Sequence, residues 1–205
     1  MPFGIPENYH LILASRSPRR QQLLREAGLK FDVVIKEYCE DWPEKLSGKE
    51  IAEFLSRKKA QMYGNEDISD NDIIITADTI VWCDGRVLDK PSGYDDAFEI
   101  LRAISGKTHE VITGVSFISR KSLHTFSETT RVTFDKLSDE DIEYYIKNYK
   151  PFDKAGAYGI QEWIGVIGNI NIEGSYFNVM GLPVNRLLKE LKEFITNINN
   201  LVRIG

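Results

Sequence analysis

Residues 72–77 constrain the fold of this chain more than any other segment. They read Asp-Ile-Ile-Ile-Thr-Ala, a nearly unbroken run of apolar and β-branched side chains. Such a run is typical of a central strand that is covered on both faces. The dipeptide Asp84-Gly85 follows shortly afterwards and has the sequence of a tight turn between antiparallel strands. The chain thus combines a buried strand with a hairpin, which predicts a sheet that is not purely parallel.

Strand-like and helix-like segments alternate along the rest of the chain. We expect further strands at residues 10–14, 31–35, 110–118, 124–134 and 164–172. We expect helices from Ser17-Pro18 to Gly28 and at residues 47–63, 95–105, 138–149 and 183–197. This alternation predicts an α/β fold with a mixed, twisted sheet flanked by helices. Because the 205 residues contain no internal repeat and no clear linker, we expect a single domain over residues 1–205.

The composition argues against several classes of protein. The net charge of −5 argues against bulk binding to nucleic acid or to an anionic membrane, although it is compatible with a local basic pocket. No apolar run approaches the ~18 residues of a membrane span, and the first residues lack the parts of a signal peptide. Cys39 and Cys83 have neither metal nor redox spacing, so we expect reduced thiols in a cytoplasmic protein.

A basic, serine-rich segment joins the first expected strand to the first helix. Ser17 and Pro18 are typical of an N-cap and of the first helical position. A helix N-terminus carries partial positive charge and favours acidic side chains, so Arg19 and Arg20 in the first turn are unexpected. Together with the hydroxyls of Ser15 and Ser17 and the free backbone N–H groups, they form a candidate anion site, most simply for phosphate. The alternative is a pair of solvated surface arginines.

Asp78 follows the run 72–77 directly, where the buried run ends. Ligands of α/β folds gather at the carboxyl ends of strands, whereas a lone aspartate often only caps a turn. If Asp84-Gly85 form a two-residue turn, the flanking residues pair, and counting back along the ladder places Thr79 opposite Lys90. Asp78 then lies close to the Lys90 ammonium group. The register thus predicts that an acid, a hydroxyl and a lysine meet at one end of the hairpin.

Lys59 is a candidate phosphate ligand in the expected helix 47–63. It follows Ile51 and Leu55 at helical spacing, so it lies on or beside the apolar face, where lysine is rarely buried without a partner. A stem that reaches out to water is the alternative. Periodicity alone does not separate Lys59 from Lys58.

Glu40 and Asp41 follow the second expected strand. They face roughly the same edge of the sheet as the first loop. A carboxylate here is a candidate ligand for Mg²⁺, which usually takes one or two carboxylates together with phosphate oxygens of a substrate. An exposed acidic loop is the alternative.

Residues 153–161 read Asp-Lys-Ala-Gly-Ala-Tyr-Gly-Ile-Gln. Gly156 and Gly159 permit a close approach of the backbone to a ligand. The amide of Gln161 offers a donor and an acceptor side by side, which matches the carbonyl and N–H edge of uracil or thymine. The alternative is a glycine-rich bend that serves only the path of the chain.

Taken together, these segments resemble the Maf family of nucleoside triphosphate pyrophosphatases, which are also described as septum-formation inhibitors. The resemblance covers roughly residues 10 to 190 and is specific to the subgroup that hydrolyses dTTP and UTP. A sister subgroup acting on N7-methyl-GTP has other residues at the positions of Arg19, Thr79 and Gln161. The matching segments, in the order of the family, are Ser15-Arg-Ser-Pro-Arg-Arg-Gln, Arg57-Lys-Lys-Ala, Ala77-Asp-Thr-Ile-Val, Asp89-Lys-Pro, Ser105-Gly-Lys-Thr-His, Asp153-Lys-Ala-Gly-Ala-Tyr-Gly-Ile-Gln and Gly174-Ser-Tyr with Gly181-Leu-Pro.

The resemblance implies cleavage between the α- and β-phosphates of a nucleoside triphosphate, with dTTP and UTP as substrates. It implies an elongated fold related to inosine triphosphatases, a central cleft, a divalent cation (Mg²⁺ or Mn²⁺) and a homodimer. The implied roles are a general base (Asp78), residues that set substrate choice (Arg19, Thr79 and Gln161), phosphate ligands (Ser15, Arg19, Lys59 and Lys90) and metal ligands (Glu40 and Asp78). Two positions depart from the family pattern, because Arg16 replaces a small residue and Glu162 stands where glycine is usual.

Two other functions are compatible with the same pocket. A regulator of cell division could bind a nucleotide without hydrolysing it, and a transferase could retain the nucleotidyl group. Release of pyrophosphate together with free monophosphate separates the pyrophosphatase from both.

Overall fold

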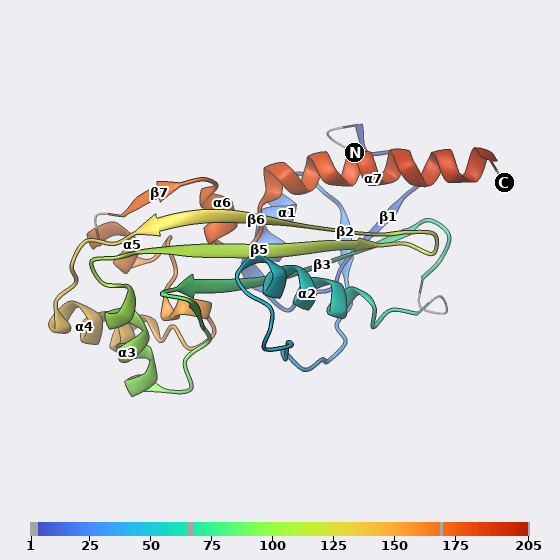
Figure 1. Cartoon of the computed structure of the whole chain (residues 1–205). Helices are drawn as coiled ribbons and strands as arrows, with labels where there is room; N and C mark the ends of the chain where they lie inside the picture. Colours follow the sequence, from blue (N-terminus) through green and yellow to red (C-terminus); the bar gives the residue numbers. More distant parts are fainter. Residues whose placement is uncertain (1–3, 65–67, 169, 205) are drawn as a thin grey trace.

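The computed structural model describes residues 4–64, 68–168 and 170–204. Helices and strands alternate through this part of the chain (Figure 1). The strands are β1 (His10–Leu13), β2 (Phe31–Val33), β3 (Asp72–Cys83), β4 (Arg86–Leu88), β5 (Thr108–Ile118), β6 (Leu123–Thr133) and β7 (Asn171–Glu173). The helices are α1 (Pro18–Glu26), α2 (Lys49–Ala60), α3 (Tyr94–Ile104), α4 (Asp139–Tyr149), the 3₁₀ turn η3 (Ala155–Ala157), α5 (Trp163–Ile167), α6 (Tyr176–Val179) and α7 (Val184–Ile204).

The strands form one seven-stranded mixed sheet. Its order is β2-β1-β3-β5-β6-β7, and β4 pairs with the far end of β3. β1 is parallel to β2 and β3, whereas the remaining pairs are antiparallel. The predicted α/β fold with a mixed sheet flanked by helices is therefore confirmed, and the molecule is elongated along β3, β5 and β6 (Figure 1).

Helices cover both faces of the sheet, as the apolar run in β3 predicts. Odd-numbered residues of β3, such as Ile73 and Ile75, pack in one core with α1 and α7. Even-numbered residues face the other side, where Ile80 packs against Ile51 and Leu55 of α2. At one end of the elongated sheet, α3, α4 and η3 enclose a further core (Figure 1). Alternation along β3 thus points successive residues to opposite faces of the sheet, where different helices cover them.

The hairpin is formed as predicted. Cys83 pairs with Arg86, and both turn residues have left-handed backbone, with φ of 50° at Asp84 and 79° at Gly85. These values suit the turn that matches the twist of the two strands. The ladder ends at Leu88, so the predicted pairing of Thr79 with Lys90 is not made.

β3 continues beyond the buried run 72–77 to Cys83, and β5 pairs with it up to Trp82. One expected strand is wrong. The expected strand at 164–172 is the short helix α5 followed by β7, and residue 169 lies outside the described residues. Gly165 lets this helix pack closely on the preceding segment, because a β-carbon at this position would lie 1.8 Å from the Ile160 carbonyl oxygen.

Two contacts hold the sheet and its helices in register. Near the start of β1, the His10 imidazole lies between two carboxylates, 2.9 Å from Asp72 and 2.8 Å from Asp32, and so joins β1 to both of its parallel neighbours. On β5, a β-carbon at Gly114 would lie 2.1 Å from the Ala52 carbonyl oxygen, so α2 packs against bare backbone there. None of the helices in the described residues combines the length and the apolar character that a membrane crossing requires.

Candidate active site

A cavity of about 590 Å³ opens beside the middle of β3. The described part of β3 pairs with β1 up to Ile75 and with β4 from Val81 onward, which leaves a gap on this edge between the two partners. All eight residues singled out from the sequence line this one cavity. They are Ser15, Arg19, Glu40, Lys59, Asp78, Thr79, Lys90 and Gln161. The structure therefore brings together residues that are up to 146 positions apart in the chain, from Ser15 to Gln161.

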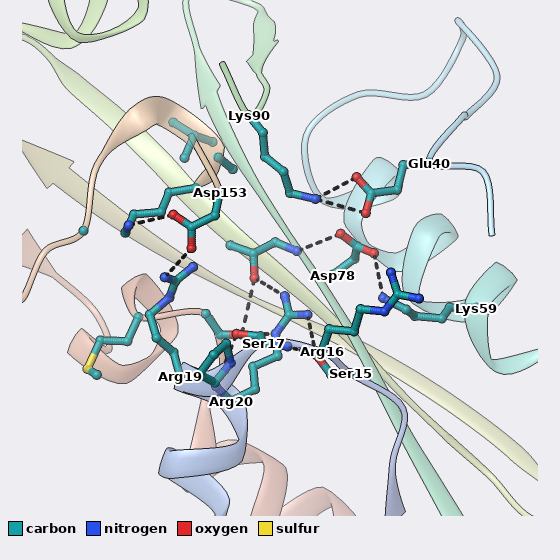
Figure 2. A pocket seen from close by; sticks show the side chains of 18 of the residues that line it. Ser15, Arg16, Ser17, Arg19, Arg20, Glu40, Lys59, Asp78, Lys90 and Asp153 are labelled. Atoms are coloured by element: carbon teal, nitrogen blue, oxygen red, sulfur yellow. Dashed lines mark hydrogen bonds and ion pairs between the residues drawn. The ribbon is translucent and has the colours of Figure 1, made fainter. Parts of the chain in front are cut away.

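Asp78 and Lys59 face each other on the α2 side of the sheet (Figure 2). The Lys59 Nζ lies 3.7 Å from Asp78 Oδ2, and both side chains are largely buried. Burial lowers the pKa of Lys59, while the Asp78 carboxylate opposes that shift. The Thr79 backbone N–H donates to Asp78 Oδ1 at 3.2 Å and so helps to fix the plane of the carboxylate. This pairing distinguishes Lys59 from Lys58, which bonds to Asp41 instead.

Tyr38 completes this side of the cavity, although the sequence analysis did not single it out. Its hydroxyl donates to Asp78 Oδ2 and lies 3.4 Å from Glu40 Oε1. Its ring lies under the Lys59 ammonium group, 4.4 Å from the Nζ to the ring centroid. Burial and the Asp78 charge raise the pKa of Tyr38, so the hydroxyl remains a donor. In the sequence, the only indication of this role is that Tyr38 is an aromatic residue two positions before the candidate ligand Glu40.

Lys90 reaches the cavity from the loop after β4. Its Nζ lies 3.1 and 3.0 Å from the two carboxylate oxygens of Glu40, so it pairs with Glu40 and not with Asp78 as the hairpin register predicts (Figure 2). The ladder ends before this point because the Asp89 carbonyl accepts from the Gly156 N–H at 3.3 Å. That bond directs the chain toward η3.

The two arginines of α1 have different surroundings. Arg20 points beneath the loop and donates to the carbonyl oxygens of Ala77 and Gly181, both at 2.8 Å, and to the Thr79 hydroxyl at 2.9 Å. Removal from water lowers its pKa, although Asp78 opposes that shift. Arg19 instead faces the cavity, 3.1 Å from Asp153 Oδ2 (Figure 2). Arg19 is the predicted phosphate ligand and lines the cavity, whereas nothing in the sequence indicates that Arg20 holds the loop against β3.

The serines shape the same loop. Ser17 is the N-cap, as predicted, and its hydroxyl accepts from the Arg20 N–H at 3.4 Å. The buried Ser15 hydroxyl accepts from the Ser17 N–H at 3.2 Å. The Thr79 hydroxyl also forms its hydrogen bonds within the protein, because it lies 2.9 Å from the Thr113 hydroxyl and accepts from Arg20.

The segment 153–161 forms another wall of the cavity. Gly156 has φ of 70°, and a β-carbon there would lie 2.8 Å from the Val81 side chain, so this glycine permits close packing on β3. Gly159 similarly packs under the Glu162 carboxylate. Both glycines therefore pack closely against neighbouring parts of the protein, which agrees with the alternative that this segment is a bend serving the path of the chain. Gln161 is exposed and lines the cavity.

The carboxylates near the cavity do not form a dense metal site. Among residues 4–64, 68–168 and 170–204, no group of three or more His, Cys, Asp or Glu side chains is arranged to hold a metal ion. Glu40 and Asp78 nevertheless approach one common point, the Tyr38 hydroxyl. Two carboxylates fit a Mg²⁺ ion that takes its other ligands from water and substrate phosphates.

Comparison with known proteins shows the family of this chain. The family model described as "Maf-like protein" matches residues 10–194. The chain belongs to the Maf family. It is 53% identical over 188 residues to the dTTP/UTP pyrophosphatase of Phocaeicola vulgatus, covering 91% of this chain and 97% of that protein. It is 50% identical to the dTTP/UTP pyrophosphatase of Flavobacterium psychrophilum, covering 88% and 92%. Among solved structures, the Staphylococcus aureus Ham1 protein aligns with a TM-score of 0.48 and 13% identity over 90% of this chain and 98% of that one.

The two residues that depart from the expected Maf pattern, Arg16 and Glu162, have different surroundings. Arg16 is exposed and pairs with Glu37 at 3.0 Å. Glu162 turns inward, where one oxygen lies 3.2 Å from Lys154 Nζ and the other accepts from the Tyr145 hydroxyl. Arg16 thus lies at the rim, whereas Glu162 belongs to the wall that presents Gln161.

Proposed function

We propose that this Maf protein is a metal-dependent pyrophosphatase that cleaves dTTP and UTP between the α- and β-phosphates. The observation that carries the proposal is the pairing of Lys59 with Asp78 inside a cavity that Arg19 and Lys90 also line. A triphosphate brings about four negative charges, and this cavity brings together three cationic side chains, Arg19, Lys59 and Lys90, each beside a carboxylate. The names of the relatives support the choice of dTTP and UTP.

In this proposal, Asp78 is the general base that takes the proton of the attacking water. The Thr79 N–H and the Tyr38 hydroxyl orient its two oxygens, and the Lys59 ammonium group lies 3.7 Å from one of them. Positive charge from Lys59 then offsets the charge that shifts onto phosphate oxygens in the transition state. Loss of one such partner costs on the order of 3 kcal/mol, or about a hundredfold in rate.

Glu40 and Asp78 are the proposed ligands of a divalent cation, Mg²⁺ or Mn²⁺. When bound, the cation would supply Lewis-acid activation of water and neutralisation of phosphate charge. The two carboxylates support this assignment because the hydroxyl of Tyr38 already lies between them. Lys90 contacts both oxygens of Glu40, so the Lys90 ammonium group would lie beside a cation held by Glu40 and would be available to the substrate phosphates.

The remaining roles concern phosphate and base. Ser15 and Arg19 are proposed to bind phosphate at the N-terminal end of α1, where partial positive charge adds to that of the guanidinium. Arg19, Thr79 and Gln161 are proposed to set substrate choice. Thr79 acts by fixing Arg20 and the loop, since its hydroxyl is already committed. The Gln161 amide is proposed to read the carbonyl and N–H edge of uracil or thymine.

We also propose that residues 1–205 form one domain, that the protein works in the cytoplasm as a homodimer, and that it binds no nucleic acid. The free thiols of Cys39 and Cys83 support a reducing compartment. Light scattering on the purified protein measures the oligomeric state.

The proposal is tested by incubating the protein and Mg²⁺ with dTTP, UTP, CTP, ATP and GTP and measuring both pyrophosphate and monophosphate. We expect equal amounts of the two products, fastest with dTTP and UTP, and no turnover after chelation of the metal. Asp78→Asn should lower kcat by ~100-fold or more while nucleotide binding persists, because a positioned base supplies that factor. Asp70→Asn is the matched control, because Asp70 is exposed and pairs with Arg120 elsewhere.

Each alternative function predicts a different outcome of this assay. Nucleotide binding without any product would identify a non-enzymatic regulator, and pyrophosphate without free monophosphate would identify a transferase. Full activity of folded Asp78→Asn would reject the role of this aspartate.

A further inference from the structure

Gln161 lies in a tight four-residue turn. The Glu162 N–H donates to the Gly159 carbonyl oxygen at 2.9 Å, which closes a turn over residues 159–162. Gln161 is the third residue of this turn, exposed to the cavity. Its amide therefore has a fixed position only if both ends of the turn are held.

One hydroxyl holds both ends. Tyr145 of α4 is fully buried, and its oxygen accepts from the Gly159 N–H at 3.0 Å while its O–H donates to the Glu162 carboxylate. Burial and the Glu162 carboxylate raise the pKa of Tyr145, so the hydroxyl remains protonated at neutral pH. Because α4 packs in the core beside α3, this clamp connects the turn to a rigid element (Figure 1).

The other oxygen of Glu162 starts a chain of alternating charges. It lies 3.2 Å from Lys154 Nζ, which lies 2.7 Å from one oxygen of Asp153. The second oxygen of Asp153 lies 3.1 Å from Arg19. The Lys154 side chain is only 9% exposed, so its ammonium group depends on these two carboxylates. The turn that presents Gln161 is thus linked to the arginine at the phosphate end of the cavity.

We propose that Tyr145 and Glu162 are positioning residues for base recognition, which clamp the turn that presents Gln161 and couple it to Arg19. This inference rests on the proposed function, because it assumes that the cavity takes a pyrimidine nucleoside triphosphate. An amide that is held in one position can form hydrogen bonds only with a base whose size brings its edge to that position. When the clamp is removed, the amide samples several positions, so the matched pyrimidine loses binding and a mismatched purine loses little.

The first test is Tyr145→Phe, which removes the hydroxyl and keeps the ring that fills the core. We compare kcat and KM for UTP with those for ATP, whose larger base offers no carbonyl at this edge. We expect the UTP-to-ATP ratio of kcat/KM to fall ~5- to 20-fold through a higher KM for UTP, because two hydrogen bonds of the clamp are lost. We expect kcat for UTP to change less than ~3-fold, since the reacting phosphates are bound elsewhere. Tyr144→Phe is the matched control, because its side chain is 49% exposed on the same helix.

The second test is Glu162→Gln, which keeps an acceptor for Tyr145 and removes the charge opposite Lys154. We expect a smaller fall of the same ratio, ~2- to 5-fold, and no change in the exposed control Glu143→Gln. Melting temperatures verify that all four variants are folded.

Equilibrium binding of UTP and ATP in EDTA measures the same preference without turnover. A UTP-to-ATP ratio that is unchanged in both variants, or an equal loss for both nucleotides through kcat, would overturn the inference. So would a wild-type protein that does not prefer UTP in either assay. A wild-type protein that binds UTP preferentially and releases no pyrophosphate overturns the proposed function alone, and the binding ratios of the variants then decide the inference.

Discussion

Replacing Arg20 with methionine should destabilise the protein far more than the same change at Arg19. Arg20 donates to two backbone carbonyl oxygens and one hydroxyl, all within 2.9 Å. One carbonyl belongs to Ala77 on β3 and the other to Gly181 before α7, so a single side chain joins α1 to two distant segments. Methionine keeps much of the volume of the stem and removes every donor.

The magnitude follows from those three bonds. A hydrogen bond from a charged donor contributes ~1.5–3 kcal/mol, and a carbonyl left without a donor costs ~1–3 kcal/mol. Arg20 lies at the wall of a cavity, so water can satisfy part of what is lost, and the net cost is about 3 kcal/mol. For a chain of this length each kcal/mol corresponds to ~2–4 °C in Tm, so we expect Arg20→Met to melt ~6–12 °C lower.

Arg19→Met is the internal control. Its side chain is 27% exposed and has one ion pair with Asp153, so its loss should cost about 1 kcal/mol or less. Thermal melting and urea titration of both variants measure the difference. Under the proposed function, Arg19→Met should raise KM for UTP without a large change in Tm. A Tm of Arg20→Met within about 2 °C of wild type, or a larger loss for Arg19→Met, would refute this account.

Two further predictions concern stability. Gly114→Ala should cost ~3 kcal/mol or more in urea titration, because the new methyl group meets the Ala52 carbonyl, whereas Gly93→Ala, with open space around it, should stay within ~1 kcal/mol. His10 should contribute to stability below about pH 6.5 and lose that contribution as the pH rises through its folded pKa, because the hydrogen bond to Asp72 and that to the flanking aspartate of β2 raise this pKa. The contribution to the free energy of unfolding is below ~1 kcal/mol because the His10 side chain is half exposed. His10→Gln should therefore remove the change of unfolding free energy with pH between pH 6 and 8. An unchanged pH dependence in this variant would contradict the prediction.

Features that depend on neighbouring residues could be predicted from the sequence. The Asp84-Gly85 turn determined its own register, and the helix expected at residues 138–149 begins with a capping box of Ser138 and Asp141. A cleft was implied by the family resemblance, but the expectation that it lies where strands end does not describe it, because Asp78 and Thr79 lie within β3. The residue roles assigned by resemblance to the family remain predictions.

Features that depend on distant residues could not be predicted in this way. Arg19 and Arg20 are equivalent as sequence, and they differ because the acceptors of Arg20 lie 57 and 161 positions away. Tyr145 and Glu162 contact each other only after α4 has packed beside the turn. The length of β3 is set by its partner β5, so the apolar run could not show that the strand continues beyond Asp78.

The position of the cavity follows from the lengths of three strands. β3 has twelve residues, whereas its two neighbours on one edge, β1 and β4, have four and three. β1 ends because α1 begins at Pro18, and β4 ends because the chain turns toward η3. Between them the Ala77 carbonyl, which a full neighbouring strand would pair, accepts from Arg20. Because side chains alternate along β3, Asp78 points toward Lys59 on α2 and Thr79 points toward Arg20 on α1. Residues from the helices on both faces of the sheet therefore meet β3 at this one gap in strand pairing.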